Sequence, residues 1–510
     1  MKCQSRITGL SSAARKARAK YASAFAAALL IALPIALGSC AVNPATGERM
    51  LSLMSPEEEQ RVGDEEHPKL VKVFGGEVQD SDLARYVDSV GNLLAQTTER
   101  PDQKFTFTII DSDIVNAFAL PGGYVHITRG LLALANNEAE LAGVLGHEMG
   151  HVVARHSAQT YTRSVLIGVL ATGVGIATGS NELGQMLNQG AAVYLQSYSR
   201  EHEYEADSLG VRYLRRAGYD PEAMAEFLKS LEASSRLEAT LAGLPPDTVD
   251  EFDIMATHPR TLDRVQRAIA EAGDGTPRGP VDDGRDIYLK KINGLIYGDS
   301  PDQGFARGDR FAHPKLRFEF RVPSGFRLVN QPSAVIARNP NGALIAFDEV
   351  PNASGLSPRG YLARLGALAD TEDITINGLA AATGRARVST NKGARDLRVI
   401  AIRFSNEHLF RFLFLTPPPL TASMEDGLKR TTYSFRTLSP AEAAALKPLR
   451  IRIVRVKPGD TVPSLSARMA FPDRKEERFR VLNGLSPSAG LTPGMLVKIV
   501  VEGDVPKEVL

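Results

Sequence analysis

The 510-residue sequence lacks tryptophan and contains only two cysteines, Cys3 and Cys40. So few cysteines exclude a disulfide scaffold and a zinc ribbon. An excess of charge is also absent, because 60 Lys and Arg balance 59 Asp and Glu. A chain without a basic surplus is not expected to bind nucleic acid. With 43% hydrophobic and 23% charged residues, the composition is that of a globular protein of about three domains.

The first forty residues predict a lipoprotein signal peptide. Six basic residues precede an uncharged apolar stretch from about Ala22 to Leu37, which is the order found in a secretory signal. The residues Leu-Gly-Ser-Cys at 37–40 resemble a bacterial lipobox, which implies cleavage of residues 1–39 and acylation of Cys40. The following Ala41 resembles an outer-membrane sorting signal. We therefore expect a lipid-anchored chain on the periplasmic side of the outer membrane; an uncleaved signal anchor is the alternative.

Residues 40–272 read as a first, mainly helical domain with a small sheet. Apolar spacing and capping signals predict helices at about 56–74, 83–95, 136–156 and 191–216, and strands at about 105–109 and 124–128 around a turn at 121–123. Val165–Ala177 is apolar but too short to span a bilayer, and we expect a buried or interfacial helix there.

Two further units are predicted after a Gly-, Pro- and Asp-rich linker at 273–286. Turn signals between alternating strands, with helices at about 361–369 and 421–433, predict a small α+β domain over 287–446 whose role the sequence does not indicate. Residues 451–502 resemble a LysM module, a β-α-α-β unit that binds N-acetylglucosamine polymers such as peptidoglycan. The segment departs from that pattern at Pro463 and at 471–477, and the alternative is a module that only packs against its neighbours. The fold class is therefore α+β.

His147-Glu148-Met149-Gly150-His151 is an HExxH motif on a predicted helix. Positions four apart lie on one helix face, so the two imidazoles can bind one zinc ion while Glu148 serves as the base. Apolar residues on the same helix indicate that it is buried, and buried histidines and a carboxylate are costly unless a charge compensates them.

A catalytic zinc site needs a third protein ligand. The segment 199–207 is the one nearby cluster dense in carboxylates. Glu203 and Asp207 are four apart, so Glu203 as the ligand and Asp207 as partner of a ligand imidazole would be coherent. Spacing alone does not choose between Glu203 and its neighbours.

HExxH followed about fifty residues later by E-x-x-A-D resembles the zinc metallopeptidase family of the CAAX prenyl endopeptidases and HtpX. The resemblance extends to Asn116–Gly123, to Ser199-Arg200, and to Thr257-His258-Pro259 with Arg264; Asn43–Gly47 resembles its periplasmic lipoprotein branch. It implies a zincin-type domain with one Zn²⁺ on His147, His151 and Glu203, and Glu148 as catalytic carboxylate. The spanning helices of membrane-embedded members are missing, which puts prenylated substrates in doubt.

In such a site zinc activates a water and polarises the scissile carbonyl, and Glu148 transfers the proton to the leaving amine. His258 is our candidate for an oxyanion donor or a fourth ligand; a plain helix cap is the alternative. We expect Asn116, Ala117, Phe118 and Ala119 to pair with extended substrate by strand addition.

The leading hypothesis is a zinc metalloendopeptidase that cleaves unfolded or misassembled envelope proteins. Alternatives are a zinc hydrolase of peptidoglycan peptides, and a chaperone-like or peptidoglycan-tethering lipoprotein. The intact Glu148 argues against a protein that has lost its activity.

Overall fold

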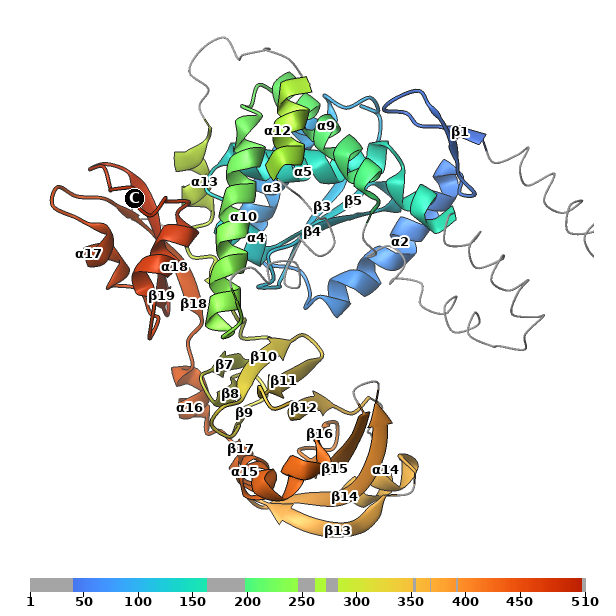
Figure 1. The fold of residues 1–510 in the computed structure, drawn as a ribbon, viewed down its shortest axis with the longest axis vertical. Coiled ribbons are helices and arrows are strands. Elements are labelled where there is room, and N and C mark those ends of the chain that lie inside the picture. Colours follow the sequence, from blue (N-terminus) through green and yellow to red (C-terminus); the bar gives the residue numbers. More distant parts are fainter. Residues whose placement is uncertain are drawn as a thin grey trace, which may run out of the picture.

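A computed structural model describes seven parts of the chain: 40–162, 198–245, 262–271, 283–351, 355–366, 368–390 and 393–506. The expected signal peptide, Val165–Ala177 and His258 lie outside these residues. Three units are visible in Figure 1: a blue-green unit, a yellow-orange unit below it, and a red β-α-α-β unit beside the long helix α10 (Glu222–Leu241). In the described part of the chain, no helix combines the length and hydropathy needed to cross a bilayer.

The first unit is mainly helical, as the sequence predicts. A capping box of Ser55 and Glu58 starts its first long helix, and Asp80 caps the next. Its helices are α2 (Pro56–Val73), α3 (Ser81–Ala95), α4 (Arg129–Leu134), α5 (Glu138–Val153), α9 (Arg200–Ala217), α10 (Glu222–Leu241) and α12 (Leu262–Glu271). A short hairpin of β1 (Cys40–Val42) and β2 (Arg49–Leu51) precedes them.

Two predicted helix boundaries are wrong. Helix α5 ends at Val153 instead of His156, because Arg155 has the left-handed φ of 58°. Helix α9 begins at Arg200 instead of near 191: Tyr198 and Ser199 are not helical, and the Ser199 hydroxyl caps the helix by accepting from the His202 N–H.

The small sheet of the first unit has the order β3-β5-β4. Strand β3 (Thr106–Ile110) is parallel to β5 (Tyr124–Thr128), and β4 (Ala117–Leu120) is antiparallel to β5. The predicted strands are found within one residue of their expected bounds. Among the described residues, β3 and β4 are the two edge strands of this sheet.

The middle unit is dominated by antiparallel sheet. One sheet has seven strands in the order β10-β11-β12-β16-β15-β14-β13, and a second has four in the order β17-β9-β8-β7. The phenylalanine-rich core between these strands also receives α15 (Thr421–Ser434), while α14 (Pro358–Arg364) packs on β14 and β15. The strands are β7 (Phe305–Arg307), β8 (Arg310–His313), β9 (Phe318–Arg321), β10 (Arg327–Gln331), β11 (Ala334–Arg338), β12 (Leu344–Glu349), β13 (Ala369–Ile376), β14 (Leu379–Thr390), β15 (Gly393–Arg403), β16 (Leu409–Thr416) and β17 (Arg436–Thr437).

The third unit is β-α-α-β: β18 (Leu449–Arg455), α17 (Val462–Ser466), α18 (Lys475–Leu482) and β19 (Leu496–Glu502). It shares one hydrophobic core with the first unit. Lys498 is fully buried there, and its ammonium donates to the carbonyls of Ala133, Leu134 and Ala135 at 2.8–2.9 Å, at the end of α4.

Helix α13 (Arg285–Lys291) and strand β6 (Ile296–Tyr297) join this shared core rather than the middle unit. Strand β6 pairs with β18, so the sheet of the third unit is completed by residues from far earlier in the chain. We expected the middle unit to start at 287; the packing places 285–297 with its neighbours instead.

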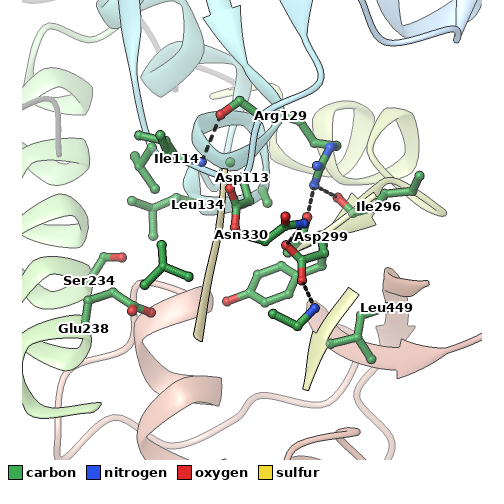
Figure 2. Close-up of a pocket in the computed structure, with 18 of the residues that line it drawn as sticks. Asp113, Ile114, Arg129, Leu134, Ser234, Glu238, Ile296, Asp299, Asn330 and Leu449 are labelled. Atoms are coloured by element: carbon green, nitrogen blue, oxygen red, sulfur yellow. Dashed lines mark hydrogen bonds between the residues drawn. The ribbon is translucent and has the colours of Figure 1, made fainter. Parts of the chain in front are cut away.

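All three units meet at a cavity of about 500 Å³. Figure 2 shows its walls: Asp113, Arg129 and Glu238 from the first unit, Asp299 and Asn330 from the middle part of the chain, and Leu449 from the third. The first and third units are thus fused by a common core, and the middle unit adjoins both.

Candidate metal centre

Helix α5 carries the HExxH motif through the interior of the first unit. The Asn137 side chain caps it by accepting from the Glu140 N–H at 2.7 Å. Every residue from Ala139 to Val153 is buried. A helix that is apolar all round is expected in a protein core, and the motif's polar side chains therefore need partners inside the protein.

Small residues let α9 approach α5 closely. A Cβ on Gly210 would lie 3.1 Å from the backbone nitrogen of His147. A Cβ on Gly150 would lie 3.1 Å from the carbonyl oxygen of Ala206. Both distances are tighter than ordinary contacts. Glycine at these positions therefore brings the backbone of α9, with its carboxylates, against the motif.

Three potential ligand atoms meet at this crossing. The Nε2 atoms of His147 and His151 lie 3.0 Å apart, and the carboxylate of Glu203 lies 3.3 Å from His151 Nε2 and 3.7 Å from His147 Nε2. Tetrahedral zinc ligands at about 2.0–2.1 Å lie about 3.3 Å from one another. Two imidazoles and one carboxylate at this spacing fit one divalent metal ion. Among the described residues, this is the one cluster of three or more such side chains able to hold an ion.

The outward nitrogen of each imidazole also has a partner. His147 Nδ1 lies 2.9 Å from Asp207 Oδ1, and His151 Nδ1 lies 2.9 Å from His156 Nδ1. Arg264 from α12 donates to Asp207 at 2.5 Å and to Glu203 at 3.2 Å. Partners of this kind fix ring orientation in metal sites.

Glu148 and Tyr198 complete the described surroundings. Glu148 is fully buried next to the first ligand. The Tyr198 ring stacks on His151 with centroids 4.0 Å apart. Burial raises the pKa of Tyr198, and the charges of Glu148 and Glu203 raise it further against a hydrogen bond from Ser157. The phenol is therefore neutral at ordinary pH and can act as a hydrogen-bond donor.

The expected substrate segment forms one of the two edge strands, β4, and Asn116 directly precedes it. Ala117, Phe118 and Ala119 are at most 6% exposed, and helix α5 packs against the strand. Any substrate pairing here would thus use main-chain atoms rather than these side chains. Strand addition remains a prediction.

Residues 81–272 match the model of peptidase family M48. This part of the chain is therefore similar to peptidase family M48. The match covers the sheet, both ligand helices and α12, which are the elements that build the site. The family is one of metallopeptidases, in agreement with the resemblance that the sequence shows.

Two curated relatives are similar to this chain in sequence. The beta-barrel assembly-enhancing protease of Yersinia pestis is 29% identical over 270 residues, which is 50% of this chain and 52% of that protein. The mitochondrial metalloendopeptidase OMA1 of Schizosaccharomyces pombe is 28% identical over 229 residues, 44% of this chain and 64% of that protein. The chain spans about half the length of the first of these relatives.

Among solved structures, PsbP from Synechocystis is similar over 26% of this chain and 95% of its own, with 18% identity and a TM-score of 0.21. LpqN from Mycobacterium tuberculosis covers 24% of this chain and 83% of its own, with 15% identity and a TM-score of 0.18. TM-scores this low assign neither a fold nor a function.

Within the matched residues 81–272, the structure brings together side chains that the sequence singles out: His147, Glu148, His151, Glu203 and Asp207. His258 is outside the described residues, and the side chain of Cys40 is too. Sequence reasoning missed His156, Tyr198 and the ionic role of Arg264. The sequence signal that could have indicated His156 is the polar run Arg155-His156-Ser157 shortly after the HExxH motif.

Proposed function

We propose that the chain is a zinc metalloendopeptidase. The observation that supports this most directly is the meeting of His147, His151 and Glu203 at ligand spacing, with Glu148 between the two histidines in the sequence. A zinc ion held by these three residues would supply Lewis-acid polarisation of the scissile carbonyl. Glu148 would accept a proton from the attacking water and deliver it to the nitrogen of the leaving amine.

Burial favours this assignment of Glu148. The carboxylate is 0% exposed and is carried by the same buried helix as the two proposed histidine ligands. We propose Tyr198, which stacks on His151, as a donor to the charge that develops near the metal. His258 is our second candidate for such a donor, or for a fourth ligand.

The substrates that we propose are unfolded or misassembled proteins of the bacterial envelope. Support comes from the beta-barrel assembly-enhancing protease of Yersinia pestis, which matches half of this chain, and from the lipobox at 37–40. We propose that Cys40 is lipidated and holds the chain at the periplasmic side of the outer membrane.

A second proposed function is glycan binding by the third unit. The β-α-α-β order supports a LysM-like module, and peptidoglycan is the polymer that such a module would bind. Glycan binding would tether the peptidase to peptidoglycan. It is also compatible with the two alternative functions, a hydrolase of peptidoglycan peptides and a chaperone-like lipoprotein. Purified muropeptides and casein-like chains as substrates separate the first of these from a protease.

The deciding experiment compares the parent with Glu148→Gln. The amide keeps the size of the side chain but cannot take a proton, so zinc should stay bound while cleavage of casein falls by a factor of at least ~100. Glu232→Gln, an exposed change on α10, is the matched control. Cleavage by Glu148→Gln at the parental rate would show that the proposed mechanism is wrong.

A further inference from the structure

A chain of hydrogen bonds, buried at His151 and His156 and half-buried at Glu205, continues from the proposed metal ligand His151 to the start of the described structure. His151 Nδ1 lies 2.9 Å from His156 Nδ1. His156 Nε2 lies 3.1 Å from Glu205 Oε2, and the other oxygen of Glu205 accepts from the amide of Asn43 at 2.6 Å. His156 is fully buried, and Asn43 is 5% exposed.

The direction of every hydrogen bond in this chain is fixed by the ligand role of His151. If His151 offers Nε2 to a metal ion, its proton is on Nδ1. His156 Nδ1 must then accept, which puts the proton of His156 on Nε2. That N–H donates to Glu205, a carboxylate that can accept on both oxygens. Asn43 can only donate there, through its amide nitrogen.

The backbone turn at Arg155 is what points His156 back at His151. A non-glycine residue at φ 58° is uncommon and strained. Contacts with the N-terminal segment hold it: Arg155 Nε donates to Glu59 at 2.8 Å, and its terminal nitrogen donates to the Met54 carbonyl at 2.7 Å. The Leu53 N–H also donates to Thr162 just beyond the turn.

Aromatic contacts fix the His156 ring in the same place. It stacks on His202 with centroids 4.3 Å apart and planes 11° apart. It meets His151 edge-on, with centroids 5.0 Å apart. The ring therefore has one orientation, in which each nitrogen faces one defined partner.

We propose that His156, Glu205 and Asn43 are positioning residues for the ligand imidazole of His151, and that the N-terminal segment 40–54 is therefore part of the metal centre. The proposal rests on the proposed zinc site. Asn43, three residues after the expected lipidation site, thereby has a role at the metal centre. A segment that only linked the chain to a lipid anchor would have no such role.

The sharpest variant is Asn43→Asp. Asn43 Oδ1 accepts from the Ala45 N–H at 2.8 Å and shapes the local turn; aspartate keeps that oxygen but replaces the donor that faces Glu205 by a second carboxylate. His156→Phe keeps the ring stack but removes both nitrogens. Glu205→Gln and Glu205→Ala form a conservative and a disruptive pair.

The experiment measures the zinc dissociation constant of the full chain in detergent by competition with a chelator. The ligand-field absorption of the Co²⁺-loaded protein reports ligand geometry alongside it. Asn43→Asp, His156→Phe and Glu205→Ala should each weaken zinc binding about 10- to 100-fold and shift the Co²⁺ bands, and Glu205→Gln should lose less than Glu205→Ala. Thr46→Ala, an exposed change in the same hairpin, should match the parent.

The outcomes separate this proposal from the proposed function. If the parent binds zinc and both Asn43→Asp and His156→Phe bind it equally well with unchanged Co²⁺ bands, the positioning role is refuted and the zinc site stands. A parent that binds no zinc would overturn both. The double variant Asn43→Asp/Glu205→Ala should lose no more affinity than Glu205→Ala alone, because both changes break the same chain; full additivity would contradict it.

Discussion

Arg264 holds Asp207 and Glu203 together by donating a hydrogen bond to each, at 2.5 and 3.2 Å. The two carboxylates lie on one face of α9 and are 0% exposed. One is expected to be a metal ligand and the other contacts a ligand imidazole. A guanidinium thus balances the negative charge of the site from a third helix.

Arg264→Met should destabilise the metal-free protein more than the zinc-loaded one. Without the guanidinium, two buried carboxylates lose their cation, and we expect the free energy of unfolding to fall by about 3–5 kcal/mol. Zinc supplies compensating charge to Glu203. Thermal unfolding with and without zinc should therefore show a larger zinc-induced rise in Tm for Arg264→Met than for the parent. The exposed change Arg236→Met is the control, and an equal rise in all three proteins would argue against this charge balance.

Gly210→Val should separate the two ligand helices. The Cβ of the added side chain would lie 3.1 Å from the backbone nitrogen of His147. Overpacking of this kind lowers the free energy of unfolding by about 1–3 kcal/mol. Because Glu203 is on the helix that must move, zinc affinity should fall together with stability. Chelator competition and denaturant unfolding measure the two effects. Lys229→Val is the control, because it puts the same side chain on an exposed helical position. A Gly210→Val protein with parental zinc affinity would show that zinc binding does not need the close crossing of the two helices.

The HExxH spacing predicts His147, Glu148 and His151 because residues four apart share a helix face whatever surrounds the helix. It does not choose Glu203 among its neighbours, because that choice depends on how α9 is rotated against α5. Contacts at Gly150 and Gly210 set this rotation, and they are visible only in three dimensions.

Other features were beyond reach of the sequence for similar reasons. The helical pattern in the sequence continues through Arg155, so no local signal predicts the turn that redirects His156. The turn is held by a contact of Arg155 with Glu59, almost a hundred residues away. The two-residue strand β6 is too short to show a period, and its pairing with β18 moves the unit boundary. The sheets of the middle unit, by contrast, follow from alternation and turn residues.

His126 should make stability fall with acid. Burial, together with the neighbouring His67, lowers the pKa of His126 to about 3. Its folded pKa is below its unfolded value of 6.5, so the stability it contributes is complete above pH 6.5 and is lost between pH 6.5 and about 3. One proton gives a slope of about 1.4 kcal/mol per pH unit.

His126→Phe should remove this part of the pH dependence. Phenylalanine can keep the stack on Phe118, whose ring centroid is 4.6 Å away. The free energy of unfolding, measured in denaturant from pH 7 to 4, should decline less steeply in the variant than in the parent. Identical slopes would show that His126 takes up its proton in the folded state.

Lys498→Met should uncouple the third unit from the peptidase domain. Three carbonyls at the end of α4 lose their common donor, which we expect to cost about 2 kcal/mol or more. Calorimetry should show the third unit unfolding ahead of the rest, and limited proteolysis should release it. The exposed Lys457→Met is the matched control. A single transition at the parental temperature would indicate that the shared apolar core alone joins the units.

The central claim is that one zinc ion is bound by His147, His151 and Glu203. Its most direct test is the zinc content of the purified full chain and of Glu203→Ala, measured by elemental analysis after dialysis against a weak chelator. We expect about one zinc per parent chain and almost none in the variant, because two imidazoles alone hold zinc weakly. Full zinc occupancy in Glu203→Ala, or none in the parent, would contradict the account.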